Sequence, residues 1–120
     1  MTMPENGGEP VAALSLTSST VDGITVVRVD GVLDATTRAQ FADYLAMAGD
    51  DLILDLAGVT FMDSRALGLI VHHWQTSLTA GTKFALIGVE YTKSKVMWIT
   101  GLAQRLPIYD TLADAVAAIK

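Results

Sequence analysis

The chain has 120 residues, of which 51% are apolar, and this size and composition fit one compact domain with its own core. Its formal net charge is −5, which argues against a nucleic-acid partner or an anionic membrane, because both attract basic surfaces. The absence of cysteine excludes disulfides, thiolate chemistry and cysteine-ligated zinc.

Residues 1–12 are predicted to be a flexible arm, because Pro4, Gly7 and Pro10 interrupt any regular element. This segment has neither the basic start nor the apolar run of a signal peptide, and no later apolar run is long enough to span a membrane. We therefore expect a cytoplasmic protein whose folded domain covers residues 13–120.

Strands are predicted where apolar residues alternate or cluster between turn residues: 13–19, 24–29 with an extension through 32–33, 51–56, 83–87 and 106–109. Helices are predicted to begin near Asp34, Ser64, Thr92 and Thr111, with Asp34 and Thr111 as side-chain caps. Alternating strands and helices favour parallel strands joined by crossover helices, and the opening hairpin makes the sheet mixed. The expected fold is a single α/β domain with a mixed sheet of four or five strands and about four helices.

The stretch GVTFMDSRALGLIV, residues 58–71, places three polar side chains between two apolar segments. Ser64 is expected to be the N-cap or the first residue of a helix, at the carboxyl edge of a parallel strand, where open α/β sheets carry functional sites. Free amides at this helix start suit a phosphate, whereas Asp63 would repel it. Phosphorylation of Ser64 would change the charge there by about −2; the alternative is a serine that only caps the helix.

The helix that starts at Ser64 is expected to have two different faces. One face is apolar and is predicted to meet the core: Leu67, Ile70, Val71, Trp74 and Leu78. The opposite face carries Arg65, Leu69, His72 and Thr76 and is predicted to point outward. A leucine between two basic-type side chains is typical of a docking face for an acidic partner, and the alternative is a scattered surface leucine.

Three motifs resemble the STAS domain family and, within it, the bacterial anti-sigma factor antagonists. The run from Phe61 to Ser64, followed by Leu67-Gly68, resembles the family's signature at the strand-to-helix corner. Residues 31–34 resemble an earlier Gly-x-Leu-Asp signature, and residues 95–102 resemble a late helix motif. Together these similarities extend from about residue 13 to the end of the chain.

The resemblance implies a switch by partner exchange. An unmodified antagonist binds an anti-sigma factor that is also a serine kinase, phosphorylation of the serine after the aspartate blocks that binding, and a serine phosphatase restores it. By position this serine is Ser64. The resemblance and the helix pattern together predict partner contacts at Asp34, Asp63, Ser64, Arg65, Leu69, His72 and Trp98.

Two residues depart from the family signature, because Arg65 and Ala66 stand where the family has Ser or Thr and then Gly. Arg65 could pair with a phosphate or with an acidic partner residue. This departure leaves open a STAS module that docks without phosphorylation, as a subunit of a transport or stress-signalling complex. A homodimer is also left open by the sequence.

Catalysis and metal binding find little support in the sequence. His72 lies eight residues from Ser64, which is about 12 Å along a helix and too far for a nucleophile and its base. His72 and His73 are adjacent and diverge, so they cannot chelate a metal from one face. We expect no enzymatic activity, no metal and no cofactor. Trp98 is interpreted either as a surface side chain packed on Lys95 or as a partner anchor.

Overall fold

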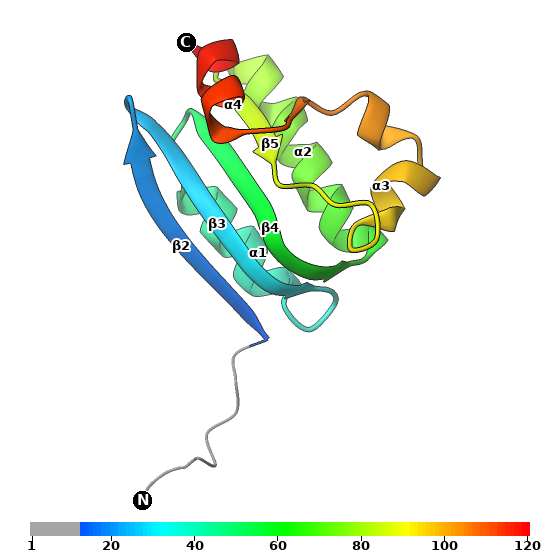
Figure 1. Cartoon of the computed structure of the whole chain (residues 1–120). Coiled ribbons are helices and arrows are strands. Elements are labelled where there is room, and N and C mark those ends of the chain that lie inside the picture. The colour runs from blue at the N-terminus through cyan, green and yellow to red at the C-terminus, as the bar shows by residue number, and fades with distance from the viewer. Residues whose placement is uncertain (1–12) are drawn as a thin grey trace, which may run out of the picture.

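The computed structural model describes residues 13–120, and the arm predicted for residues 1–12 lies outside the described residues. Five strands form one sheet in the order β2-β3-β4-β5-β6 (Figure 1). β2 pairs antiparallel with β3 and all other pairs are parallel, which confirms the predicted mixed sheet. The strands are β2 (Leu14–Val21), β3 (Ile24–Leu33), β4 (Leu52–Met62), β5 (Phe84–Ile87) and β6 (Ile108–Tyr109).

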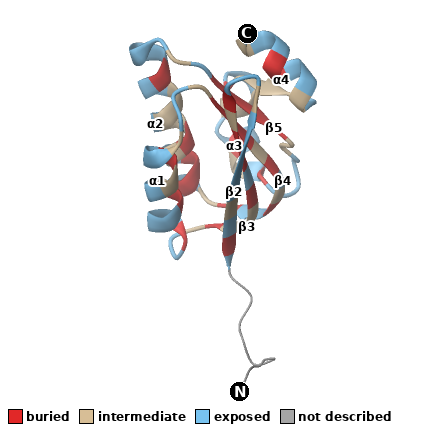
Figure 2. Ribbon diagram, turned by 90° about the vertical axis from the view of Figure 1, so that its left-hand side faces the viewer, coloured by how far each residue is buried: buried red, intermediate tan, exposed pale blue. Residues whose placement is uncertain are grey.

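Helices cover both faces of this sheet. They are α1 (Arg38–Met47), α2 (Ser64–Ala80), the short α3 (Lys95–Ile99) and α4 (Leu112–Ile119), with a 3-10 turn at Leu102–Gln104. Figure 2 shows α1 and α2 on one face and α4 on the other. None of the helices within residues 13–120 has the length and apolar character needed to cross a membrane.

The alternation of side chains along the inner strands divides the core into two layers. On β3, Val27 and Val29 are fully buried in the layer that contacts α1 and α2, whereas Val26 belongs to the layer under α4. On β4, Leu54 faces the first layer and Ile53 the second. Both faces of these parallel strands are therefore apolar, as expected for strands with helices on both sides.

β4 is longer than the strand predicted for residues 51–56 and continues to Met62. The Ala57-Gly58 pair looks like the start of a turn, but here it belongs to an irregular stretch of the strand. The pairing of β3 with β4 shifts twice, between Arg28 and Asp30 and between Gly31 and Val32, and each shift leaves one extra residue in β4. Such bulges bend and twist a strand, and here they precede the corner that leads into α2.

Two helices begin later than predicted. α1 starts at Arg38 rather than near Asp34, because the Asp34 side chain accepts hydrogen bonds within a preceding turn and not from the first turn of the helix. α3 starts at Lys95 rather than near Thr92, since a turn closed by the Ser94 N–H on the Glu90 carbonyl comes first. Thr111 is confirmed as the cap of α4, accepting from the Asp114 N–H at 3.1 Å.

The buried face of α2 differs from the predicted apolar stripe. Leu78 was assigned to the core but is 65% exposed, whereas Ser77 is 4% exposed. The buried residues Ala66, Leu67, Ile70 and Ser77 are centred about 60° around the helix from the predicted stripe, at 100° per residue. The apolar pattern alone suggested the wrong centre, because it gave no weight to the small residues that let α2 pack closely.

Gly31 should be the glycine least tolerant of substitution. Its φ is +114°, and an added Cβ would lie 2.1 Å from the Ala13 carbonyl oxygen. Gly31→Ala is expected to lower the free energy of unfolding by about 2 kcal/mol or more, measured by urea denaturation. Gly68→Ala is the matched control: it lies within α2 and its Cβ would meet nothing within 4 Å, so it should stabilise by about 0.5–1 kcal/mol. Equal effects of the two substitutions would contradict this packing.

Candidate functional site

The ends of β3 and β4 bring two predicted site residues to one edge of the sheet. Leu33 and Met62 are register partners, so Asp34 and Asp63 are the first residues to leave the two strands. The Asp63 N–H donates to the Leu33 carbonyl at 2.9 Å, which continues the pairing by one bond. Figure 1 shows the loop after β3 and the start of α2 at this same edge. It is the carboxyl edge of the parallel strands, as the sequence predicted.

Asp63 is the N-cap of α2. Its Oδ1 accepts from the Ala66 N–H at 2.9 Å, and its carbonyl accepts from the Leu67 N–H at 3.1 Å. Ser64 is therefore the first residue of the helix, one of the two predicted positions, and the interpretation that it caps the helix is wrong. Because Asp63 supplies the cap, the Ser64 hydroxyl is not needed to hold the helix start, and the Ser64 side chain is exposed.

Asp34 organises the neighbouring loop. Its Oδ1 accepts from the Thr36 hydroxyl at 2.6 Å and from the Thr36 N–H at 2.8 Å. The bond from the Thr36 hydroxyl is the main cause that lowers the pKa of the Asp34 carboxyl, and the bond from the Thr36 N–H lowers it further. Both bonds favour the charged form of the carboxyl.

Thr37 stabilises the same loop through two hydrogen bonds of its side chain. Its buried hydroxyl accepts from the Asp34 N–H at 3.1 Å and donates to the Val32 carbonyl at 2.8 Å. Sequence reasoning missed both threonines of this loop because it started the helix near Asp34, which would place Thr36 and Thr37 in its first turn. The run Asp34-Ala35-Thr36-Thr37 carries a signal for it, since Asp and Thr side chains commonly bond to backbone groups two or three residues away.

Opposite charges lie close together at this corner. Asp34, Asp63 and Arg65 give it a formal charge of −1, while the free amides at the start of α2 add a partial positive charge. Ser64 and Arg65 are both exposed beside these groups. We use the word corner for Asp34, Asp63, Ser64 and Arg65 together. Added charge on the Ser64 hydroxyl would change the net charge of this corner sharply.

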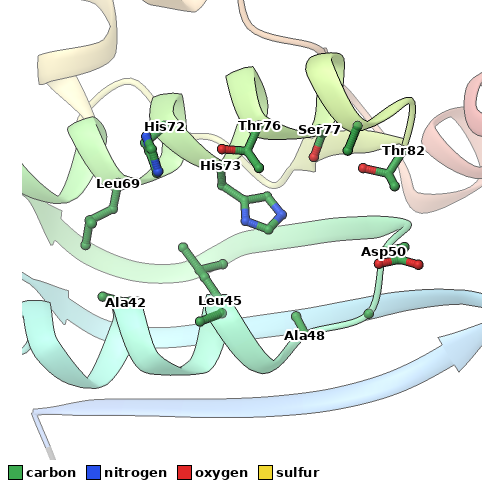
Figure 3. A pocket seen from close by; sticks show the side chains of 13 residues that line it. Ala42, Leu45, Ala48, Asp50, Leu69, His72, His73, Thr76, Ser77 and Thr82 are labelled. Carbon is green, nitrogen blue, oxygen red and sulfur yellow. The ribbon is translucent and has the colours of Figure 1, made fainter.

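Leu69 and His72, which were predicted as contacts on the same outward face, lie further along α2. Both line a groove between α1 and α2 (Figure 3). His72 is exposed, but Leu69 is half-buried and packs against the core, so the prediction that Leu69 points fully outward is wrong. The reason is the rotation of the buried face of α2, which brings Leu69 toward α1. A charged residue at this position would therefore destabilise the fold as well as change its surface.

Trp98 lies on α3, which packs against α2 on the side away from α1 (Figure 1). Its ring is 39% exposed and meets the Tyr91 ring edge-on, with centroids 5.3 Å apart and planes at 75°. The structure thus gives Trp98 an aromatic neighbour, where the sequence suggested Lys95. Trp98 is separated from the groove residues Leu69 and His72 by α2 itself.

His72 and His73 are adjacent on α2, and both line the groove between α1 and α2. His73 is half-buried, and its ring lies 5.2 Å from that of Phe84. Burial lowers the pKa of His73 below its ordinary value of 6.5, and the charge of His72 lowers it further. Within residues 13–120, no three His, Cys, Asp or Glu side chains are grouped so that they could hold a metal ion.

Known proteins resemble this chain over most of its length. The STAS domain family model matches residues 15–115. An anti-sigma F factor antagonist from Paenibacillus polymyxa is 27% identical over 107 residues, which cover 82% of this chain and 88% of that protein.

Solved structures with similar folds include an anti-sigma factor antagonist from Mycobacterium paratuberculosis, with a TM-score of 0.77, 26% identity and coverage of 88% of this chain and 93% of that chain. The Bacillus cell fate determinant SpoIIAA in its phosphorylated form has the same fold, with a TM-score of 0.60, 23% identity and coverage of 90% and 100%.

Capping by Asp63 predicts unequal effects at two adjacent positions. Asp63→Ala removes the acceptor of the Ala66 N–H and should lower the free energy of unfolding by about 1 kcal/mol, within 0.5–2. Ser64→Ala should change it by less than about 0.5 kcal/mol, because the hydroxyl is exposed and outside the cap. Chemical denaturation of both variants measures this. A larger loss at Ser64 than at Asp63 would show that the cap is assigned to the wrong residue.

The lowered pKa of His73 predicts a loss of stability in mild acid. Below about pH 6.5 the unfolded chain takes up the proton first, so the free energy of unfolding should fall as the pH drops toward the lower pKa of the folded state. The chain has only two histidines, so His73→Gln should flatten this dependence. His72→Gln should leave most of it, because burial of His73 is the larger cause. Chemical denaturation of both variants between pH 7 and pH 5 tests this prediction. If the free energy of unfolding depends on pH equally in the two variants, burial of His73 is not the cause.

Proposed function

The chain belongs to the STAS domain family, among the anti-sigma factor antagonists, and we propose that it binds an anti-sigma factor through the corner at the start of α2 and releases it when Ser64 is phosphorylated. The observation that carries the proposal is that Asp63, and not Ser64, caps α2 at this corner. Asp63 holds the helix start through the Ala66 N–H, and the adjacent Ser64 hydroxyl is exposed and structurally dispensable. A residue in that position can be modified without unfolding the helix.

The physical effect of modification is electrostatic. A phosphoryl group adds about −2 to a corner whose charged side chains sum to −1. The free amides at the start of α2 favour this charge, whereas the Asp63 carboxylate, which already accepts from the Ala66 N–H, repels it. The added charge therefore has to be accommodated by solvent and by Arg65. A partner that presents acidic or apolar groups to the unmodified corner would lose affinity.

The proposed contact surface starts at this corner and continues along α2. Asp34 is held in one conformation by Thr36, so it can offer a fixed carboxylate to a partner. Arg65 offers an exposed cation at the start of α2, and His72 lies exposed further along the helix. Leu69 contributes the part of its side chain that the core leaves uncovered. Trp98, on the far side of α2 from α1, is a second contact only if the partner reaches around α2.

Within this proposal the protein acts by binding and carries out no catalysis. Its partner is an anti-sigma factor that is also a serine kinase, and a serine phosphatase returns Ser64 to its unmodified state. Arg65 supports the other candidate role, that of a docking subunit in a transport or stress-signalling complex that is never phosphorylated. Arg65 fills a position where the sequence signature of the family has Ser or Thr, which gives a kinase a different surface to recognise.

A pair of substitutions at Ser64 separates binding from stability. Ser64→Asp should weaken binding to the anti-sigma factor at least tenfold, because it adds a carboxylate beside Asp63, whereas Ser64→Ala should retain wild-type affinity. Isothermal titration calorimetry with purified anti-sigma factors from the same genome measures both. Ser19→Asp, which adds the same charge at an exposed position of β2, is the control and should bind like wild type. Equal affinity of Ser64→Asp and wild type would rule out a switch at this residue.

A further inference from the structure

A groove of about 400 Å³ lies between α1 and α2 and has two different ends (Figure 3). Ala42, Leu45 and Leu69 form an apolar end, whereas the end toward the α1–β4 loop is lined by Asp50, Ser77 and Thr82. A volume of this size falls in the range of small-molecule sites, which are mostly apolar with a few convergent polar groups. The residues that line the groove do not belong to the corner that carries Ser64.

Ser77 shows that the polar end is unsatisfied as it stands. Its side chain is 4% exposed, and its oxygen points into the groove. Thr79, two residues later, donates its hydroxyl to the Gln75 carbonyl at 3.2 Å, but the Ser77 hydroxyl makes no hydrogen bond to any residue within 13–120. A buried hydroxyl without a partner costs free energy, and such groups are rare in folded proteins. Ser77 therefore points to a ligand atom that it would bind.

Asp50 supplies the charge at this end of the groove. Its carboxylate is exposed and forms no ion pair within the described part of the chain. The Thr82 N–H donates to the Ser77 carbonyl at 3.0 Å, so the backbones of the two residues are joined where α2 ends, and both residues line the groove. His73 also lines the groove and is kept neutral by its burial near neutral pH. The polar end thus combines one negative charge with two hydroxyl oxygens.

We propose that this groove binds a small organic molecule with a protonated primary amine and an apolar body. An ammonium group has three N–H donors and no acceptor, so it suits an end of the groove where the side chains of Asp50, Ser77 and Thr82 all offer oxygen acceptors. The apolar body would lie on Leu45 and Leu69. An anionic ligand is disfavoured because it would meet Asp50 with no lysine or arginine among the groove residues. The site is independent of the proposed switch at Ser64.

The test uses 2-phenylethylamine as the probe, followed by ¹⁵N–¹H NMR titration of the full chain at pH 7.5. Saturable shifts are expected for amides at the end of α1 and along residues 72–82, with a Kd in the range of about 1–10 mM. The neutral isostere 2-phenylethanol should bind at least fivefold more weakly, and 3-phenylpropanoate should give no saturable shift there. Absence of saturable shifts with the amine, or equal affinity for the alcohol, would overturn the proposal.

Three variants locate the site. Asp50→Asn and Ser77→Ala should each weaken 2-phenylethylamine binding at least fivefold, while their spectra stay dispersed and otherwise like wild type. Asp43→Asn is the matched control, because it removes the same charge from an exposed position of α1 that does not line the groove. Equal binding by Asp50→Asn and wild type would overturn the assignment of the amine to this carboxylate. Equal weakening by Asp43→Asn would show a general charge effect and would likewise overturn it.

Discussion

The architecture of the corner at the start of α2 depends on Asp63, which joins β3, β4 and α2 through two backbone hydrogen bonds and one side-chain hydrogen bond. Its N–H extends the β3–β4 pairing to the Leu33 carbonyl, and its carbonyl and carboxylate accept the first amides of α2 from Leu67 and Ala66. A cap of this kind fixes the direction in which a helix leaves a strand. The position of Ser64 relative to the sheet follows from these bonds and not from any contact of its own.

This arrangement explains how one residue could be regulated while its neighbours stay in place. The helix start has amides that attract an anion, yet those of Ala66 and Leu67 are already bonded to Asp63, whose carboxylate repels added negative charge. Added charge on Ser64 would therefore act mainly on what approaches the corner from outside. The loop after β3 is similarly fixed, since Thr36 and Thr37 satisfy the Asp34 carboxylate and N–H. A rigid surface that changes only its charge is well suited to switching between partners.

The sequence predicted the order of elements, the mixed sheet and the helix that starts at Ser64, because these depend on apolar periodicity and on the strand-to-helix signature. It did not predict where α1 begins, since Asp34 and Thr37 have the chemistry of a helix cap but form a turn before it. Small residues were also underweighted. Ala66 and Ser77 belong to the buried face of α2, whereas Leu78, the more apolar residue, lies beside that face and is largely exposed.

The candidate site was predicted in part. Asp34, Asp63, Ser64 and Arg65 share one edge because consecutive parallel strands end there, and this can be read from the chain order. The groove between α1 and α2 could not be foreseen, because it depends on the separation of two helices, and the alanines and the half-buried His73 that line it carry no sequence signal for that separation. Ser77 has no sequence signal of its own, since a serine in a helix is ordinarily exposed or bonded to the preceding turn.

The most direct test of the account is the site of phosphorylation itself. The purified chain would be incubated with ATP and each anti-sigma factor kinase of its genome, followed by intact-mass measurement and peptide mapping, with Ser64→Ala in parallel. The account predicts the addition of one phosphoryl group, mapped to Ser64 and absent from the Ser64→Ala protein. No modification by any kinase that binds the chain, or modification that persists in Ser64→Ala, would contradict it.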